Sequence, residues 1–425
     1  MGLNSAVTCC SASREVQACM SSQFPTARSP AAHLAYLDGL RGLAALQVVL
    51  GHAVMQIHWG SAPPSGFIGV ATWLMSFARE AVAVFIVLSG FCLMLPVVRR
   101  DGVLQGGALL FFKRRARRIL PPYFFALGLS LLLIWTLIGL KTQTHWDVAL
   151  PADGKAILSH LLLVQDLFHD TSARINHVMW SISVEWRIYF LFPLLVLLWR
   201  RAGAVSATLI ALVSSYTLLR WLHFDWLNTG PFGLCPQFLG LFALGMLGAG
   251  VAHSKEPTLT RVRDAVPWAL VAIVALAGAI VTREAKLLGG RALPWYLRDY
   301  LLGLFSMSLM VSAAVSPQRP VPRFLAWKPV AFLGTFGYSL YLMHAPFLQV
   351  ITQYLLVPLG LPPAAAFFLL VLLGTPVVVL LCHGFYLLCE RPFLNPRGAE
   401  PGRTTLPPLN VVGGVGIEPS EPAAG

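Results

Sequence analysis

Charged residues are scarce in this sequence, and acidic ones are the scarcest. Only 12% of the 425 residues are Asp, Glu, Lys or Arg, whereas 56% are hydrophobic and the mean hydropathy is +0.70. Soluble domains carry roughly twice this share of charged residues. The scarcity excludes a soluble protein of two or three domains and predicts an all-α protein with about ten helices that cross a membrane.

The sequence also lacks paired cysteines and an apolar segment at its start. The seven cysteines form no Cys-x-x-Cys pair, and four of them lie in apolar runs where a free cysteine behaves as a small hydrophobic residue. We therefore infer neither a disulfide framework nor a metal site. Residues 1–33 are polar and are not a cleaved signal peptide. They are either a disordered cytoplasmic tail or the product of a start assigned too early.

Ten apolar runs have about the length that a bilayer requires. They cover residues 37–58, 81–98, 119–140, 180–199, 204–222, 232–252, 265–283, 296–316, 330–353 and 364–389. These runs predict one integral-membrane domain over residues 34–394. Residues 395–425 are rich in Pro and Gly without apolar periodicity, so we expect a second disordered cytoplasmic tail there.

Lys and Arg are spread unevenly between the two sides that these runs define. If the N-terminus is cytoplasmic, about two thirds of the 31 Lys and Arg residues fall on the cytoplasmic side. Arg283, Lys286 and Arg291 are the clearest exceptions. The bias predicts cytoplasmic termini in a multi-pass protein of a bacterial inner membrane. It also explains the net charge of +13 without a nucleic-acid partner.

The first apolar run contains an Asp, an Arg and a His, and each is costly in hydrocarbon. Arg41 and His52 are eleven residues apart, a spacing that returns to nearly the same helix face about 16 Å further along the axis. An aligned cation and imidazole suit chemistry or ion passage within a membrane. The alternative is that Asp38 and Arg41 anchor the helix at the interface and that His52 is a satisfied interior residue.

A basic run precedes the third apolar run, with Lys113, Arg114, Arg115, Arg117 and Arg118 in six residues. The positive-inside rule alone could account for such a cluster. Five cations exceed what orientation requires, however, and arginine forks bind phosphate in a bidentate manner. We interpret the run as a site for a phosphorylated ligand at the cytoplasmic mouth.

Three further patterns place polar side chains inside predicted helices. Glu185 lies four residues from both Ser181 and Tyr189, so its carboxylate shares a helix face with two hydroxyl groups. This carboxylate is either a proton handler or a structural hydrogen-bond hub. Arg187 points to another face of the helix and is expected to snorkel outward. Tyr341 and His344 share a face of the ninth run. Ser89-Gly90-Phe91 offers a small surface at which two helices can approach closely.

Residues 141–179 form the longest polar connection on the predicted outer side. This loop contains four acids, Asp147, Asp153, Asp166 and Asp170. It is either a cover for a substrate that arrives from outside or a simple connector.

These motifs together resemble the integral-membrane acyltransferase family called acyltransferase 3. The resemblance covers residues 34–394 and rests on motifs that occur in the family's order. They are Leu37-Asp38-Gly39-Leu40-Arg41-Gly42 with the Arg-x10-His pair, Phe85 to Phe91, the basic run that ends in Pro121-Pro122-Tyr123, Trp180 to Trp186, Gly245-Met246-Leu247, Tyr338 to His344, and Glu390-Arg391-Pro392. The resemblance implies transfer of an acyl group, commonly acetyl from acetyl-CoA, to a hydroxyl of a carbohydrate or related acceptor. Some relatives carry an SGNH-type esterase domain after the tenth span, and without one a hand-over would need a partner protein.

Residues and resemblance lead to one expected mechanism. We expect His52 to act as general base or transient acyl carrier, Arg41 to orient the donor or stabilise negative charge, and Glu185 to orient His52 or the acceptor. Arg115 and Arg118 are the expected ligands of the acyl-CoA phosphates, with Arg114 and Arg117 as the register alternative. The expected substrate channel comprises Ser89, Tyr189, Tyr338, Tyr341 and His344. Acyl-CoA is a substrate here, and no metal or permanently bound cofactor is expected.

The expected partners are acyl-CoA, a carbohydrate or glycolipid acceptor and membrane lipids. Two other classes remain open. A secondary transporter or an exporter of lipid-linked substrates also has many spans with charges inside, although no inverted repeat of residues 37–52 is visible. A non-catalytic assembly subunit is the third class.

Overall fold

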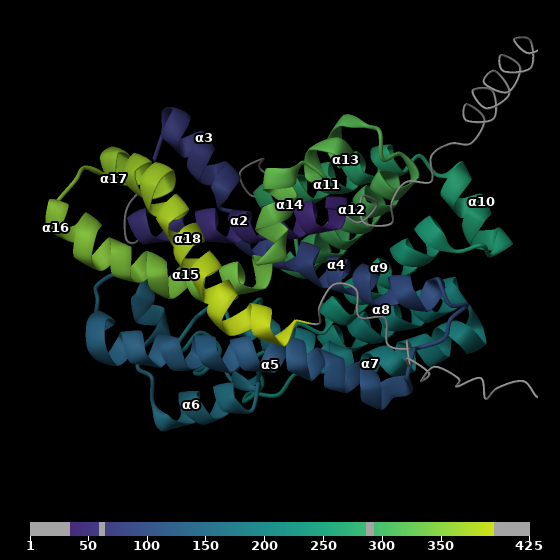
Figure 1. Ribbon diagram of the computed structural model, residues 1–425, viewed down its shortest axis with the longest axis horizontal. Coiled ribbons are helices and arrows are strands. Elements are labelled where there is room, and N and C mark those ends of the chain that lie inside the picture. The colour runs from purple at the N-terminus through teal and green to yellow at the C-terminus, as the bar shows by residue number, and fades with distance from the viewer. Residues whose placement is uncertain (1–34, 59–63, 286–292, 395–425) are drawn as a thin grey trace, which may run out of the picture. The chain divides into compact units, whose positions relative to one another are not determined.

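The computed structural model describes residues 35–58, 64–285 and 293–394, which are helical and contain no strand (Figure 1). The predicted tails, 1–33 and 395–425, lie outside the described residues. The chain divides into a unit Met1–Phe393 and a unit Leu394–Gly425. All helices of the described residues lie in the first unit.

The helices follow one another along the chain with short connections. They are α2 (Ala35–His58), α3 (Gly66–Met75), α4 (Ala78–Val98), α5 (Gly107–Leu133), η1 (Ile134–Ile138), η2 (His145–Ala149), α6 (Gly154–Leu161), η3 (Gln165–Leu167), α7 (Trp180–Ala202), α8 (Ala204–Trp221), α9 (Gln237–His253), α10 (Pro257–Ala265), α11 (Trp268–Glu284), α12 (Trp295–Val315), α13 (Pro320–Leu325), α14 (Lys328–Thr335), α15 (Gly337–Ile351), η4 (Thr352–Leu356), α16 (Val357–Leu359), α17 (Pro363–Leu369), η5 (Leu370–Gly374), α18 (Thr375–Phe385), η6 (Tyr386–Glu390) and η7 (Arg391–Phe393).

The predicted all-α polytopic membrane architecture is confirmed. Within the described ranges, 8 helical stretches are long and apolar enough to cross a membrane, and a ninth is formed if α9 and α10, bent by 92°, count as one span. The remaining predicted run, 265–283, corresponds to α11, which has 17 residues and is shorter than these stretches. Each of the ten predicted runs thus has a helical counterpart.

Three predicted runs differ in where their helices begin or break. The second stretch begins at Gly66, well before residue 81, and is interrupted between α3 and α4. The third begins at Gly107, so the basic run lies inside α5, because Arg and Lys are good helix formers. The run 330–353 is divided between α14 and α15, which break at Phe336.

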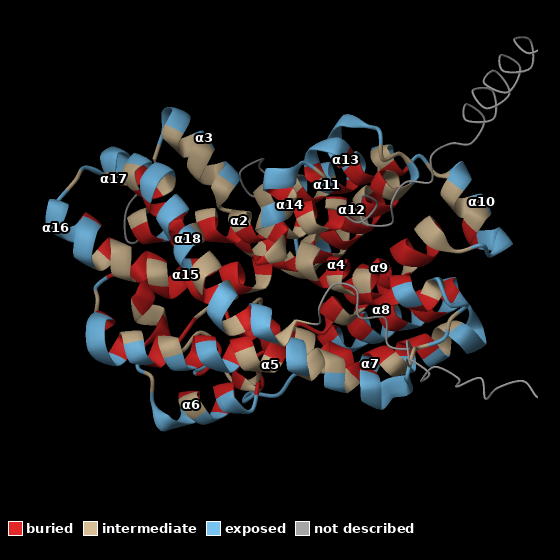
Figure 2. Cartoon of the chain, viewed as in Figure 1, coloured by how far each residue is buried: buried red, intermediate tan, exposed pale blue. Residues whose placement is uncertain are grey.

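Glycine allows α4 and α9 to touch backbone to backbone. A Cβ atom added at Gly90 would lie 2.1 Å from the carbonyl oxygen of Phe242, and one at Gly245 would lie 2.0 Å from that of Val87. Small residues permit such close packing inside membranes. Figure 2 shows α4 and α9 among the elements with the most buried residues. The small interface predicted at residues 89–91 therefore exists.

Glycines also allow the beginning of α2 to pack closely against α13 and α14. A Cβ atom at Gly39 would lie 1.8 Å from the carbonyl oxygen of Leu325, and one at Gly334 would lie 1.8 Å from that of Asp38. No side chain fits in either space. The glycines around Arg41 therefore fix the position of the helix turn that carries it.

The motif at the end of the last helix closes the first turn of α15. Glu390, which is 2% exposed, accepts a hydrogen bond from the backbone nitrogen of Ser339 at 3.1 Å. A carboxylate is favoured there because the first turn of a helix has unsatisfied N–H groups and the positive end of the helix dipole.

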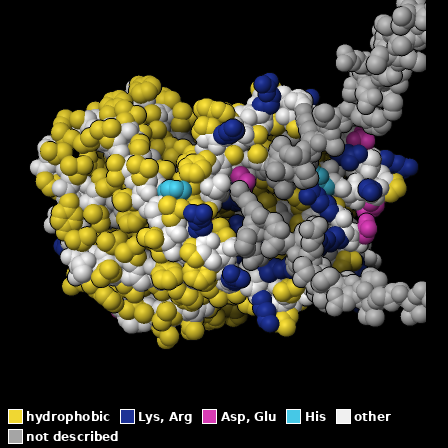
Figure 3. All heavy atoms as spheres, viewed as in Figure 1, with side chains coloured by type: hydrophobic (Ala, Val, Ile, Leu, Met, Phe, Trp, Pro, Cys, Tyr) yellow, Lys and Arg dark blue, Asp and Glu magenta, His cyan; other side chains and the backbone are white. Residues whose placement is uncertain are grey.

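The surface is apolar over much of the face shown in Figure 3, whereas Lys and Arg gather in its right-hand half, which contains α10 and α13. Large apolar side chains such as Trp135, Trp221 and Leu388 are exposed by 62%, 82% and 78%. A soluble protein rarely exposes so much apolar surface in one region. This distribution is that of a protein surrounded by lipid.

Candidate functional site

One pocket brings together side chains from α2, α4, α5, α7 and α15. Eight of the residues expected to act in catalysis, donor binding or the substrate channel line it, namely Arg41, Ser89, Arg115, Arg118, Glu185, Tyr189, Tyr338 and Tyr341. Apolar residues such as Phe85, Ile86 and Leu93 complete the wall. Arg114 and Arg117 do not line the pocket, so the face of α5 that bears Arg115 and Arg118 points inward.

The pocket has more positive than negative charge, and two of its arginines have no counter-ion. Neither Arg115 nor Arg118 forms an ion pair within the described ranges. Nε of Arg115 is buried and has no hydrogen-bond partner. Arg115 is partly buried and Arg118 is exposed, so two guanidinium groups without an acidic partner among the described residues face the pocket, and this part of it is suited to an anionic ligand.

Arg41 is held from three sides at the edge of this pocket. Its Nη1 donates a hydrogen bond to Asp38 at 2.7 Å, and its Nη2 lies 3.7 Å from Sγ of Cys92 on α4. Its Cγ packs so close to Gly337 that an added Cβ there would lie 3.2 Å away. The guanidinium is therefore fixed between α2, α4 and α15.

Hydroxyl groups connect Glu185 to the opposite wall. Tyr189 donates a hydrogen bond to Glu185, and its oxygen lies 2.8 Å from Oγ of Ser89. Because Tyr189 donates its only hydroxyl proton to Glu185, the Ser89 hydroxyl must donate to the oxygen of Tyr189. The expected bond between Glu185 and Ser181 is not formed, since Ser181 bonds the hydroxyl of Tyr341 at 2.6 Å instead.

Glu185 makes no contact through which it could orient His52, and the other part of the expectation, that Glu185 orients the acceptor, stays a prediction. No hydrogen bond joins the two residues, because Glu185 faces the pocket from α7, whereas His52 faces other histidines. Glu185 belongs to the walls of the pocket with Tyr189.

His52 and His344 contact each other between α2 and α15. Nε2 of His344 lies 3.1 Å from Nδ1 of His52. Nδ1 of His344 lies 3.0 Å from the carbonyl oxygen of Leu340, so it carries the proton and leaves Nε2 as an acceptor. Nδ1 of His52 then carries the proton shared by His344 and the carbonyl oxygen of Val48 at 2.9 Å. This assignment leaves Nε2 of His52 as the basic atom.

Two histidines of the loop 141–179 complete a cluster that the sequence did not predict. The ring centroids of His52 and His177 are 4.9 Å apart, as are those of His145 and His177. Burial lowers the pKa of His145, and burial together with the neighbouring His52, His145 and His344 lowers that of His177 well below 6.5. The available signal was the presence of four histidines, His145, His160, His169 and His177, in the loop 141–179. Nothing local placed His145 or His177 beside His52.

A single helix, α15, links the pocket to this histidine cluster, which comprises His52, His145, His177 and His344. Tyr341 lines the pocket, and its ring centroid lies 6.1 Å from that of His344 on the same helix. Arg41 and His52 both face α15, at Gly337 and at His344 respectively. One helix pair therefore carries the cation and the imidazole.

Gln349, just beyond His344 on α15, joins this helix to α2 and to the loop that contains His145. Its Oε1 accepts hydrogen bonds from Nε2 of Gln56 on α2 at 3.0 Å and from Oγ1 of Thr144 in the loop at 2.8 Å. Its own amide nitrogen donates to Gln353 at 3.0 Å. Gln56 is one turn beyond His52, and Thr144 precedes His145, so this side chain sets the spacing between them.

An ion pair joins the loop 141–179 to α7. Arg187 donates hydrogen bonds to both carboxylate oxygens of Asp166, which is 0% exposed. The prediction that Arg187 snorkels outward is therefore wrong, because a buried carboxylate from the loop binds its guanidinium. Burial raises the pKa of Asp166, and the hydrogen bonds from Arg187 act in the opposite direction.

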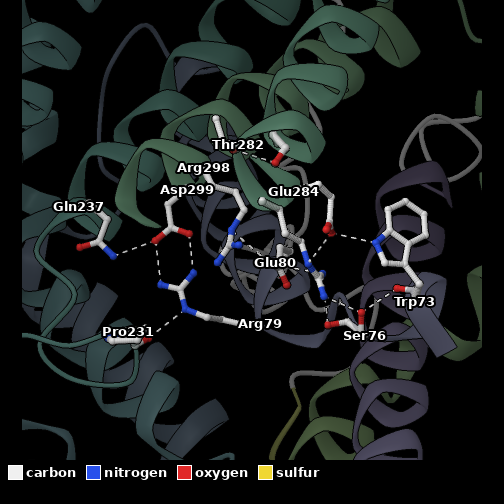
Figure 4. A network of polar contacts seen from close by, with 12 residues as sticks. Trp73, Ser76, Arg79, Glu80, Pro231, Gln237, Thr282, Glu284, Arg298 and Asp299 are labelled. Carbon is white, nitrogen blue, oxygen red and sulfur yellow. Dashed lines mark hydrogen bonds and ion pairs between the residues drawn. The ribbon is translucent and has the colours of Figure 1, made fainter. Parts of the chain in front are cut away.

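A second charged network lies apart from the pocket, among α4, α9, α11 and α12 (Figure 4). Arg79 binds Asp299 through two bonds of 2.6 and 2.9 Å, and Gln237 donates to the same carboxylate at 2.9 Å. Glu80 lies 3.2 Å from Arg298 and 3.6 Å from Arg283. Because its acids and bases neutralise one another, this network joins helix ends and offers no site for a charged ligand.

Comparison with known proteins gives the following findings. A family model described as an acyltransferase domain matches residues 34–383. The O-acetyltransferase OatA of Staphylococcus aureus (strain COL) is 25% identical over 338 residues, which are 76% of this chain and 52% of that protein. The putative peptidoglycan O-acetyltransferase YrhL of Bacillus subtilis (strain 168) is 24% identical over 343 residues, 74% of this chain and 49% of that protein.

A third relative, nodulation protein 10 of Rhizobium leguminosarum bv. viciae, is 25% identical over 212 residues, 47% of this chain and 54% of that protein. The chain thus spans about half the length of the curated relatives it matches. No solved structure matches it.

Proposed function

Because this chain belongs to the acyltransferase 3 family of integral-membrane acyltransferases, we propose that it is an O-acyltransferase that moves an acyl group, acetyl first of all, from acyl-CoA to a hydroxyl of a carbohydrate or glycolipid. Two relatives named as O-acetyltransferases support the type of transfer. The observation that carries the proposal is the pair of arginines without counter-ions, Arg115 and Arg118, in a pocket that α15 links to His52.

The pocket suits the two ends of an acyl-CoA molecule. The guanidinium forks of Arg115 and Arg118 offer bidentate hydrogen bonds to the phosphates at the mouth. The apolar wall formed by residues such as Ile86 and Leu93 accepts the pantetheine arm. Arg41, at the edge of the pocket, would orient the donor, because it lies about 16 Å before His52 along α2 and does not reach the acyl carbon next to His52.

Nε2 of His52 is the atom to which we assign the proton transfer. The acceptor hydroxyl gives its proton to Nε2, its oxygen bonds the acyl carbon, and the carbon–sulfur bond breaks. The proton then passes from His52 to the CoA thiolate. As a carrier, the same atom would first take the acyl group as the carbon–sulfur bond breaks and the thiolate leaves, and would then pass the group to the hydroxyl oxygen, whose proton goes to the thiolate. Both routes use the tautomer that His344 favours.

We further propose that donor and acceptor reach His52 from opposite sides of a cell membrane whose cytoplasmic face bears both termini. The arginines of the pocket belong to the basic run on the cytoplasmic side, and His145 and His177 belong to the loop on the outer side. His52 is about 16 Å beyond Arg41 along α2, within reach of both sides.

Sealed right-side-out vesicles test this proposal. Radiolabelled acetyl-CoA loaded into the lumen should yield base-labile acetyl esters on glycans outside, whereas external acetyl-CoA should fail until detergent opens the vesicles. Vesicles with His52→Ala provide the matched control for other acetylating enzymes. Label transfer from external donor in demonstrably sealed vesicles would overturn the two-sided arrangement. Equal transfer by wild-type and His52→Ala vesicles would overturn the assigned activity, and movement of an intact solute without donor consumption would favour a transporter.

A further inference from the structure

We infer that His177, in the outer loop, is a further catalytic residue, which holds the acceptor hydroxyl by a hydrogen bond and turns its proton toward His52. The inference rests on the proposed function and names the element that receives the acceptor. According to this inference, a ligand with an alcohol group binds beside His177, on the outer side of the histidine cluster.

The first observation is that His177 has unused hydrogen-bonding capacity. Both of its ring nitrogens are buried, and neither has a hydrogen-bond partner among residues 35–58, 64–285 and 293–394. More than about 90% of buried polar groups in folded proteins are satisfied, so an exception calls for a missing partner. The ring is enclosed by three others, with centroids 4.9 Å from His52, 4.9 Å from His145 and 5.5 Å from Trp146.

The second observation is that the residue before His177 is anchored to two helices. Nδ2 of the fully buried Asn176 donates to the carbonyl oxygen of Leu342 on α15 at 2.9 Å and to Oγ of Ser130 on α5 at 3.2 Å. His177 is thereby tied to the helix that carries His344. Its distance from His52 is set by contacts that involve neither ring.

The third observation is backbone strain just before this position. Ile175 has φ of +63°, which is unfavourable for a β-branched residue. It is fully buried, and its nitrogen donates to the carbonyl oxygen of Ala149 at 2.8 Å. Such a conformation persists only where surrounding contacts impose it, and such residues cluster at functional sites.

An alcohol supplies what His177 lacks. A neutral imidazole offers one N–H donor and one acceptor, and a hydroxyl oxygen accepts readily while its proton remains available to another base. The N–H of His177 would donate to the acceptor oxygen, and that hydroxyl would donate to Nε2 of His52. During transfer the proton moves to His52 and the oxygen bonds the acyl carbon. His177 keeps its own proton throughout.

Kinetics with the full-length protein in proteoliposomes test the inference. His177→Ala should lower kcat/KM for the acceptor by about 10- to 100-fold, the cost of losing one hydrogen bond to a buried group, and leave KM for acetyl-CoA within about twofold. His169→Ala is the matched control, because His169 is an exposed histidine of the same loop. His177→Asn and His177→Gln place an amide nitrogen near the position of Nδ1 or Nε2, and one of them should recover most of the loss.

Several outcomes would overturn the assignment. These are an acceptor kcat/KM in His177→Ala within about threefold of wild type, an equal loss in His169→Ala, or a loss that appears in donor KM alone. If His177→Ala does not fold, the comparison of His177→Asn with His177→Gln tests the assignment. Equal values of kcat/KM for the acceptor in these two variants would overturn it. If wild type and His52→Ala do not differ, the proposed function fails. If they differ and the His177 variants match wild type, only this inference fails.

Discussion

Nε2 of His344 lies 3.1 Å from Nδ1 of His52, and this contact selects the nitrogen of His52 that is free for chemistry. His344 is fully buried, and its other nitrogen is bonded to its own helix at Leu340, so it has one way to meet His52. In the proposed mechanism, His344 is therefore a positioning residue, whereas His52 meets the reactants.

His52→Ala should leave less than about a tenth of the transfer activity, which corresponds to a loss of more than about 1.4 kcal/mol of transition-state stabilisation. His344→Ala should lower kcat by about 10-fold or more with little change in KM for acetyl-CoA, because the donor does not touch it. His344→Gln keeps an acceptor oxygen toward His52 and should recover part of kcat. Retention of more than a tenth of the activity by His52→Ala would rule out both of its proposed roles.

Replacing Arg115 and Arg118 by Gln should raise KM for acetyl-CoA about tenfold or more and lower kcat much less. The reason is that the phosphates are remote from the reacting thioester and that a hydrogen bond to a charged group contributes about 1.5–3 kcal/mol. Arg114→Gln with Arg117→Gln removes the same charge from the same helix outside the pocket and should leave KM nearly unchanged. Steady-state kinetics at low and high salt measure both variants, and equal effects of the two pairs would show that the run serves orientation alone.

Gln349→Met should lower both kcat and the thermal midpoint, because it leaves the amide of Gln56 and the hydroxyl of Thr144 without their shared acceptor. Each unsatisfied buried donor costs about 1–3 kcal/mol. Gln353→Met removes only the bonds on the far side of Gln349 and should have the smaller effect on kcat. A wild-type kcat in Gln349→Met would show that this residue does not set the geometry of the histidine cluster.

His160 in α6 should make the protein less stable as the pH falls. Burial lowers its pKa from 6.5 to about 4. Between these values the unfolded chain binds a proton that the folded protein does not, so the contribution is complete above about pH 6.5 and declines toward pH 4 by about 3 kcal/mol.

Thermal unfolding in detergent between pH 7 and pH 4.5 measures this effect. His160→Gln should show a smaller fall in melting temperature than wild type, whereas His169→Gln, at an exposed position, should behave as wild type. The same fall in His160→Gln and wild type would assign the acid sensitivity to other groups.

The sequence was sufficient for the membrane architecture and for the residues of the inner pocket. Apolar runs predict spans because a helix must stay apolar over the thickness of a bilayer, and this constraint is local. The spacing of Arg41 and His52 likewise follows from helix geometry alone, and both side chains do face α15. The basic run in α5 was equally visible, because the positions of Arg115 and Arg118 on one face depend only on their separation of three residues.

Only the tertiary structure decided what surrounds His52. His177 is 125 positions further along the chain, and its place beside His52 depends on Asn176 reaching Leu342 and Ser130. The binding of Arg187 to Asp166 and the contact of Glu185 with Tyr189 were likewise decided by the tertiary structure. The partner of a buried polar group is set by the path of distant segments. Helical periodicity tells which face a side chain occupies but carries no information about what lies opposite it.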